Sequence, residues 1–359
     1  MTIAQRMKKG VEDNKTGTVG TQKKLLNGNS FLLLITIALF TAMYVSGMII
    51  FNSKGFSKPQ MFLNLFISNA GLLVITMGQT IVMITGGIDI SVGSITALVC
   101  MVVADSMENK GASAYEALLF ALLIGLAFGI VQGFLISYLQ IQPFIVTLAG
   151  MLFARGMTAI VNTDMISISN DVFLGWAKYR IYLPFGSYTK KGVYMPAYIS
   201  PAVVVAVVIF LFIVFLMKFT KFGRQLYAIG GNQTSAMMMG LNVRRTKMKA
   251  YVLDGVLAGI GGFLFCLNSC AGFVEQAKGM EMDAISASVI GGTLLSGGIG
   301  SPVGSLFGVL IKGTISSLIT TQGTLSSWWV RIVLSALLCF FIVLQAVFAR
   351  FKKKVADKQ

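Results

Sequence analysis

Histidine is absent from this chain of 359 residues, and Asp, Glu, Lys and Arg together make up only 12% of it. The lack of histidine removes the commonest general base and the commonest metal ligand. The sequence also has no Gly-Lys dipeptide, which excludes a Walker-type P-loop for nucleotide phosphates. We therefore predict that the chain has no catalytic residues and binds no metal, and that any ATP hydrolysis it depends on takes place on another chain.

Low charge is accompanied by high hydrophobicity. Hydrophobic residues make up 55% of the chain and its mean hydropathy is +0.80, whereas an average soluble domain is about 25% charged. This composition is typical of a polytopic membrane protein. The four cysteines lie in or at the ends of apolar segments without the spacing of a metal site, so we interpret them as small buried hydrophobic residues.

Ten apolar segments separated by polar breaks predict an all-α polytopic membrane protein of about ten transmembrane helices, some of them broken. The segments are residues 31–51, 61–84, 91–107, 115–138, 144–161, 198–217, 250–270, 284–298, 303–321 and 327–349. With a cytoplasmic N-terminus, the inner side carries 18 Lys and Arg residues and the outer side 8, which places both termini inside. A transmembrane domain over 31–349 is thus flanked by basic cytoplasmic tails at 1–30 and 350–359. This bias also explains the net charge of +16 without a nucleic-acid partner, because basic inner loops lie against anionic lipid.

The segment from Thr85 to Gly93 is the most informative motif because it places Asp89 among glycines between two apolar spans. A carboxylate at membrane depth is costly, and such residues mark transport pathways. The glycines predict a broken helix that restarts with Ser91 as its N-cap, and irregular backbone at this depth has to line a cavity or pack inside protein. For Asp89 itself we favour a structural role, either a hydrogen bond to the backbone of its own break or an ion pair with Arg155.

A second Gly-rich break covers residues 291–304, where Ser301 followed by Pro302 predicts that a helix restarts. Two such breaks in corresponding halves indicate an internal duplication with a pathway between them. The structural alternative for the second break is close helix packing through small residues. The candidate pathway residues are those of the two breaks and the neutral polar side chains beside the first: Asn69, Gln79, Thr85, Gly86, Gly87, Asp89, Ser91, Gly291, Gly292 and Thr293.

Three other charged residues lie within apolar segments, and for each we expect a structural explanation. Lys312 is expected to snorkel toward the interface, and Arg331 to lie near the outer interface. Asp254 is expected near the cytoplasmic surface, paired with Lys247 or Tyr251.

Two loops are too long and too patterned to be simple connectors. The outer loop, residues 162–197, interleaves aromatic residues with Lys and Arg, which predicts either a docking surface for another protein or an aromatic belt at the membrane interface. The inner loop, residues 218–249, contains a segment from Gly230 to Gly240 that predicts a short helix capped by Asn232 or Thr234. Its small and Met side chains would form an apolar knob for a partner's cleft. A helix lying on lipid is the weaker alternative, because residues 230–242 have no Lys or Arg.

Four motifs together resemble the permease subunits of bacterial ABC importers for monosaccharides, of the ribose and galactose type. They are Thr-Gly-Gly-Ile-Asp-Ile-Ser-Val-Gly at 85–93, Ala-Ile-Gly-Gly-Asn at 228–232, Asp-Ala-Ile at 283–285 and Gly-Gly-Thr-Leu-Leu-Ser-Gly-Gly at 291–298. The resemblance runs from about residue 60 to residue 348. Finer motifs, Leu-Ala-Gly-Met at 148–151 with Arg-Gly at 155–156 and Gly-Thr-Leu-Ser-Ser-Trp-Trp at 323–329, are similar to the galactofuranose type of these permeases.

The resemblance implies a transport subunit of the bacterial inner membrane that carries out no chemistry. It implies a periplasmic sugar-binding protein meeting residues 162–197, an ATPase subunit with two nucleotide-binding domains that holds ATP and Mg, and a second permease. In the galactofuranose type that permease is a different chain, of the YtfT type, so a heterodimer is expected. The implied ATPase-coupling residues are Gly230, Gly231, Asn232, Ser235, Ala236, Met239 and Gly240, and the Met-Met-Met run at 237–239 departs from the family pattern. Permeases for ribose, nucleosides or other small solutes remain alternatives, and so, more remotely, does a secondary transporter, although the chain has few intramembrane titratable groups.

Overall fold

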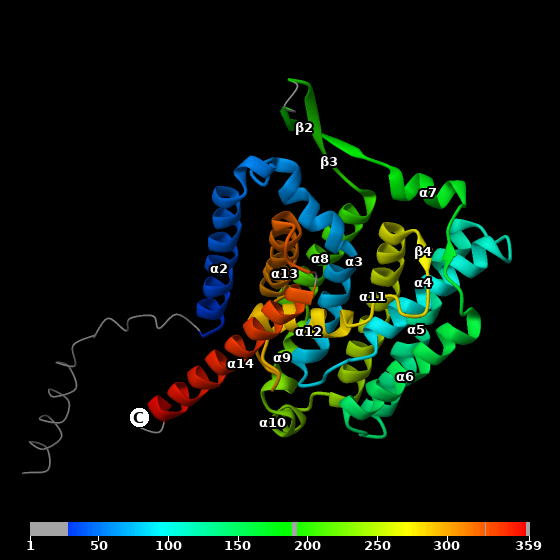
Figure 1. Ribbon diagram of the computed structural model, residues 1–359. Helices are drawn as coiled ribbons and strands as arrows, with labels where there is room; N and C mark the ends of the chain where they lie inside the picture. The colour runs from blue at the N-terminus through cyan, green and yellow to red at the C-terminus, as the bar shows by residue number, and fades with distance from the viewer. Residues whose placement is uncertain (1–27, 189–191, 327, 357–359) are drawn as a thin grey trace, which may run out of the picture.

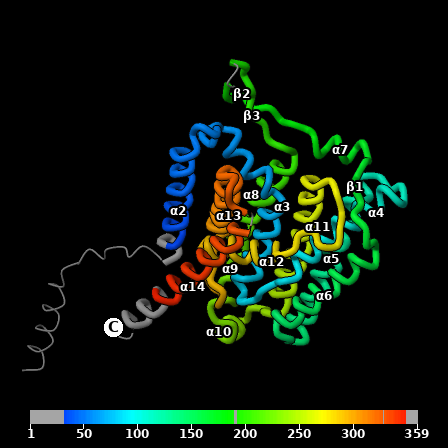
Figure 2. The backbone as a smooth tube through the Cα atoms, in the orientation of Figure 1, coloured from blue at the N-terminus to red at the C-terminus, as the bar shows by residue number. Residues whose placement is uncertain are grey.

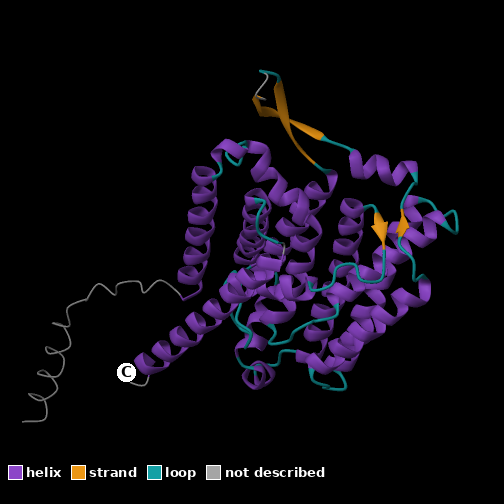
Figure 3. Cartoon of the chain, in the orientation of Figure 1, coloured by secondary structure: helices purple, strands orange, loops and turns teal. Residues whose placement is uncertain are grey.

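The computed structural model describes residues 28–188, 192–326 and 328–356 as a bundle of helices with a small amount of sheet at one end (Figure 3). Residues 1–27 of the predicted N-terminal tail lie outside the described residues. The predicted C-terminal tail begins inside the last helix, which continues to Ala356. The all-α fold class predicted from the apolar segments is confirmed.

Eight of the described helices are long and apolar enough to cross a membrane. They are α2 (Gly28–Ile50), α3 (Pro59–Ile84), α5 (Ala114–Ser137), α6 (Pro143–Val161), α8 (Pro201–Phe219), α11 (Val243–Ser269), α13 (Pro302–Gln322) and α14 (Trp328–Ala356). The two remaining predicted spans correspond to α4 (Val92–Glu108) and α12 (Met280–Ile290), of 17 and 11 residues. At a rise of about 1.5 Å per residue, α12 covers only about half of a bilayer core. These two shorter helices are the ones that follow or precede the Gly-rich breaks.

The side chains of α3, α4 and α11 are largely buried, and α3 and α11 run through the middle of the bundle in Figures 1 and 2. Helices α5 and α11 approach each other so closely that a Cβ atom on Gly125 or Gly255 would overlap the backbone carbonyl of the other glycine. A Cβ on Gly259 would likewise overlap the carbonyl of Ala121. Close packing through small residues is the usual way in which transmembrane helices associate, because lipid offers no hydrophobic driving force between them.

One end of the bundle carries the strands. Strands β2 (Ile181–Tyr188) and β3 (Tyr194–Ile199) form an antiparallel hairpin that projects from the bundle, and α7 (Asp171–Lys178) lies beside it (Figure 1). A second short pair, β1 (Ile166–Ser167) with β4 (Ala271–Gly272), ties the 162–197 loop to the end of α11. The 162–197 loop predicted from the sequence is therefore folded. The charge bias of the sequence makes this the outer end.

The opposite end carries α9 (Lys221–Gly231) and α10 (Gln233–Met238), and α10 lies at the lower edge of the bundle in Figure 1. They form the first part of the inner loop that the sequence predicts over 218–249. Helix α11 already begins at Val243, because Asn242 caps it by accepting a hydrogen bond from the backbone of Arg245 at 3.0 Å. The helix therefore starts seven residues before the predicted span.

An ion pair inside the bundle joins α12 to α13. Lys312 Nζ lies 3.3 Å from a carboxylate oxygen of Asp283 and 3.5 Å from the side-chain oxygen of Asn69. Lys312 therefore has partners within the protein, where the sequence predicts a side chain that snorkels to the interface. The pairing offsets part of the cost of placing both charges at membrane depth.

Candidate functional site: two helix breaks against the coupling segment

The first break separates α3 from α4 and is organised by Asp89. Gly86 has φ +81°, a conformation that favours glycine, and the chain then turns through residues 87–91. Asp89 is buried and accepts hydrogen bonds from the backbone N–H of Ser91 at 2.7 Å and from its hydroxyl at 2.6 Å. Gln132 on α5 in turn donates to the Ser91 hydroxyl at 2.9 Å. Asp89 thus hydrogen-bonds the backbone of its own break, as one of the two alternatives predicted.

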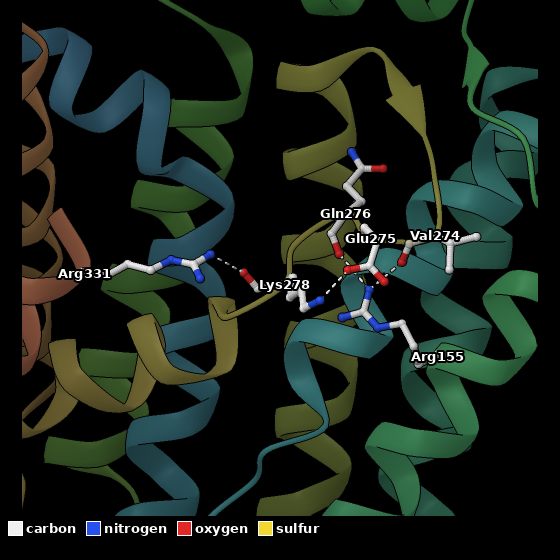
Figure 4. Close-up of polar contacts among 6 residues, drawn as sticks. All are labelled: Arg155, Val274, Glu275, Gln276, Lys278 and Arg331. Carbon is white, nitrogen blue, oxygen red and sulfur yellow. Dashed lines mark hydrogen bonds and ion pairs between the residues drawn. The ribbon is translucent and has the colours of Figure 1, made fainter. Parts of the chain in front are cut away.

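The other alternative, an ion pair between Asp89 and Arg155, does not form among the described residues. Arg155 donates instead to the backbone carbonyls of Val274 at 2.7 Å and Gln276 at 2.9 Å (Figure 4). The sequence predicts that Ser91 is the N-cap of α4, but its backbone is already helical and its side chain does not cap the helix. The Ser91 hydroxyl is used by Asp89.

The second break separates α12 from α13 and lies against the first. Three of its glycines, Gly292, Gly297 and Gly298, have φ between +76° and +91°. The backbone N–H of Gly298 donates to the carbonyl of Ile84, the last residue of α3, at 2.9 Å. The two breaks, about 200 residues apart in the sequence, therefore touch through main-chain atoms.

The end of α9 completes this junction. A Cβ atom on Gly230 would overlap the Ile84 carbonyl and would lie 2.5 Å from the backbone nitrogen of Gly298. Tyr227, one turn earlier, donates its hydroxyl to the carbonyl of Gly300 at 2.9 Å. The three segments meet so closely that Gly230 has no room for a side chain. We call this contact of Ile84, Gly230 and Gly298 the glycine junction.

Helix α10 follows directly and carries the knob predicted from the sequence. Asn232 caps it by accepting a hydrogen bond from the backbone of Ser235 at 2.9 Å, and Gly240 ends it with φ +79°. Ala236 is buried and packs with Ile229 and Val243. The three methionines that follow, Met237, Met238 and Met239, are exposed. The result is an apolar surface on a short helix that is rigidly attached to α9 and α11.

The remaining pathway candidates differ in what their polar atoms bind. Asn69 and Thr85 hydrogen-bond the carbonyls of Leu65 and Val82 on their own helix, both at 2.7 Å. Gln79 is fully buried, and neither atom of its amide has a hydrogen-bond partner in the described part of the chain. Gly87 packs beneath the Tyr251 hydroxyl, and Gly291 packs on the backbone of Gly304. The hydroxyl of Thr293 is buried and has no partner within the described residues either. Gln79 and Thr293 are therefore enclosed by the protein, with polar atoms that hydrogen-bond nothing among the described residues.

Asp254 lies deeper than the sequence indicates. It is fully buried in α11, and within the described residues neither of its carboxylate oxygens accepts a hydrogen bond from a donor. Lys247 donates to Gln233 at 2.8 Å and Tyr251 leaves its hydroxyl without a partner there, so neither predicted pairing forms. A Cβ on Gly78 would overlap the Asp254 carboxylate, which fixes its position between α3 and α11.

Comparison with known proteins identifies the family. The family model described as the branched-chain amino acid transport system permease component matches residues 61–342. The chain belongs to this family. The match includes both breaks, the glycine junction and α10. No solved structure gives a significant match.

Curated relatives cover nearly the whole chain. The inner membrane ABC transporter permease protein YjfF of Escherichia coli is 40% identical over 87% of this chain and 91% of its own length. The fructose import permease FruG of Bifidobacterium longum is 31% identical over 87% and 89%. The ribose import permease RbsC of Escherichia coli is 34% identical over 78% and 82%. The chain is thus a multi-pass permease subunit of the inner membrane in an ABC importer, where ATP is hydrolysed by a separate subunit.

Proposed function

We propose that this chain is one of the two permeases of an ATP-driven importer for a monosaccharide of the galactose kind, galactose or its furanose form. The sugar class is supported by the fructose and ribose import permeases among the relatives, and the galactose kind by the motifs at 148–151, 155–156 and 323–329, which resemble the galactofuranose type. The observation that supports transport by conformational change is the glycine junction. It joins the segment exposed to the cytoplasm to both helix breaks through main-chain contacts.

The junction accounts for how motion of an ATPase reaches the pathway. Helix α10 offers Met238, 84% exposed, as an anchor for the cleft of an ATPase subunit with two nucleotide-binding domains, which holds ATP and Mg. Displacement of α10 moves α9. Helix α9 is in direct backbone contact with Ile84 and Gly298, because Gly230 has no side chain to separate them. Packed contacts of this kind shift between discrete arrangements and do not deform gradually. The two breaks therefore move with α10.

The outer end suits a periplasmic sugar-binding protein. Tyr179, Tyr182 and Tyr188 of the loop and hairpin are more than 60% exposed, and exposed aromatic residues are enriched at protein interfaces. The second permease of the complex is proposed to be a different chain, of the YtfT type.

Reconstitution tests this assignment. Proteoliposomes containing this permease and its ATPase, supplied with ATP and binding protein, are given labelled galactose and labelled ribose, with and without the second permease. We expect galactose uptake only when both permeases are present. Ribose uptake by this permease without the second one would instead indicate a homodimeric ribose importer.

A further inference from the structure

A shallow cavity of about 400 Å³, widely open to the outside, lies at the outer end of α11, and none of the predicted pathway residues lines it. Its walls are formed by Phe265 and Ser269 of α11, by the loop that follows, and by Arg331 of α14. The volume falls within the range of small-molecule sites, which typically combine apolar walls with a few polar groups.

The loop that forms this cavity, residues 270–279, is built in a strained conformation. Cys270 has φ +49° and Ala277 has φ +56°, values that side chains other than glycine rarely adopt. Residues of this kind persist only where their surroundings fix them, and they cluster at functional sites. The loop is therefore a shaped part of the molecule and not a simple connector between α11 and α12.

Two arginines hold the loop from opposite sides, as Figure 4 shows. Arg155 of α6 donates to the carbonyls of Val274 and Gln276, and Arg331 donates to the carbonyl of Lys278 at 3.2 Å. The amide of Gln276 is buried and bridges the loop internally, donating to the Ser269 hydroxyl at 2.8 Å. The loop residues Phe273, Glu275 and Lys278 line the cavity, and the side chains of Glu275 and Lys278 are exposed.

The cavity side chains match the chemistry of a neutral sugar. Phe265 and Phe273 provide apolar walls for the C–H face of a ring. Glu275 and Lys278 form an exposed ion pair at 2.6 Å, and the hydrogen bond from Lys278 lowers the pKa of Glu275. The pair therefore has no net charge but offers an acceptor and a donor side by side, as hydroxyl groups require. Arg331 adds a donor and is held in place over the ring of Trp328 at 5.1 Å.

We propose that the cavity bounded by Phe265, Phe273, Glu275, Lys278 and Arg331 is the outer sugar site of this permease, where a neutral monosaccharide released by the binding protein binds before it passes the helix breaks. The inference rests on the proposed function for its substrate class. It goes further by placing the first sugar contact on the 270–279 loop, away from the motifs that identify the family.

Sugar binding at this site is tested directly by protection of a cysteine. Ser269→Cys is introduced together with Cys270→Ser and Cys339→Ser, and the assembled transporter is treated with a membrane-impermeant thiol reagent. We expect galactose at about ten times its Kd to slow labelling of Cys at 269 about tenfold, and glycerol, which has hydroxyl groups but no ring face for Phe265 and Phe273, to have little effect. Asp164→Cys, on an exposed turn outside the cavity, is the control and should label at an unchanged rate. Unprotected labelling at 269, or equal protection by glycerol, would overturn the proposal.

A transport measurement separates a sugar contact from a structural role. We expect Phe273→Ala and Lys278→Gln to lower sugar uptake about tenfold while the ATP hydrolysis stimulated by loaded binding protein changes less than about twofold. Lys58→Gln, which removes an exposed outer charge outside both the cavity and the 162–197 loop, should transport normally. If both cavity variants take up sugar normally in a system in which the wild type also does so, the proposed site is wrong and the proposed function is not affected. A wild-type complex that imports no monosaccharide counts against the proposed function itself.

Discussion

Gly230→Ala is expected to uncouple the permease, whereas Gly231→Ala, one residue further on, is expected to behave like the wild type. An added Cβ at position 230 collides with the Ile84 carbonyl and the backbone of Gly298, so the glycine junction has to open. At position 231 no atom lies within 4 Å of the added Cβ. We expect sugar uptake by Gly230→Ala to fall at least about tenfold, the effect of about 1.4 kcal/mol at the junction.

The measurement compares uptake and ATP hydrolysis of the two variants in the same proteoliposomes. An uncoupled Gly230→Ala transporter should assemble with its ATPase and hydrolyse ATP, but binding protein loaded with sugar should no longer stimulate that hydrolysis. Equal uptake by the two variants would show that the contact between α9 and the breaks does not transmit motion. The sequence predicts both Gly230 and Gly231 as coupling residues. The comparison of the two variants tests whether only Gly230 transmits motion.

Gly255→Ala is expected to destabilise the fold itself. Its Cβ would overlap the carbonyl of Gly125 and would lie 2.7 Å from the backbone of Gly129, so α5 and α11 have to separate. Overpacking of this kind costs about 1–3 kcal/mol, and the loss here should lie at the upper end because both obstacles are backbone. Thermal unfolding of the purified permease in detergent measures the change.

Gly156→Ala supplies the matched control for this prediction. Gly156 also lies in a transmembrane helix, but it is exposed and nothing lies within 4 Å of an added Cβ. Its substitution should leave the unfolding temperature unchanged or slightly raised, because alanine favours helix over glycine by about 1 kcal/mol. If the two variants unfold at the same temperature, α5 and α11 are not packed as the structure has them.

Hydropathy and local signals predict much of this architecture. The ten apolar segments correspond to ten helices, and the cap of α10 at Asn232 and its stop at Gly240 follow from residue chemistry that acts over one turn. The two breaks are visible for the same reason, since runs of glycine disrupt a helix wherever they occur.

Long-range pairing is what the sequence does not determine. Lys312 pairs with Asp283 of α12, Arg155 binds carbonyls of the loop after α11 and Asp254 is buried against α3, because each of these neighbours comes from another element of the chain. A hydrogen bond to a backbone carbonyl in particular cannot be predicted from residue types, because every residue has this carbonyl. The 270–279 loop shows the same limit: Gly279, with φ +89°, is a turn signal, but Cys270 and Ala277 are not residue types that mark a positive φ, and their conformation is fixed by surrounding contacts.

The most direct test of the account is accumulation of labelled galactose inside proteoliposomes that contain this permease, its partner permease and the ATPase, with binding protein on the outer side. We expect galactose to accumulate above its external concentration only when ATP is present on the ATPase side, and we expect omission of this chain to abolish accumulation. Uptake by this chain alone without ATP would contradict this expectation and would indicate a secondary transporter.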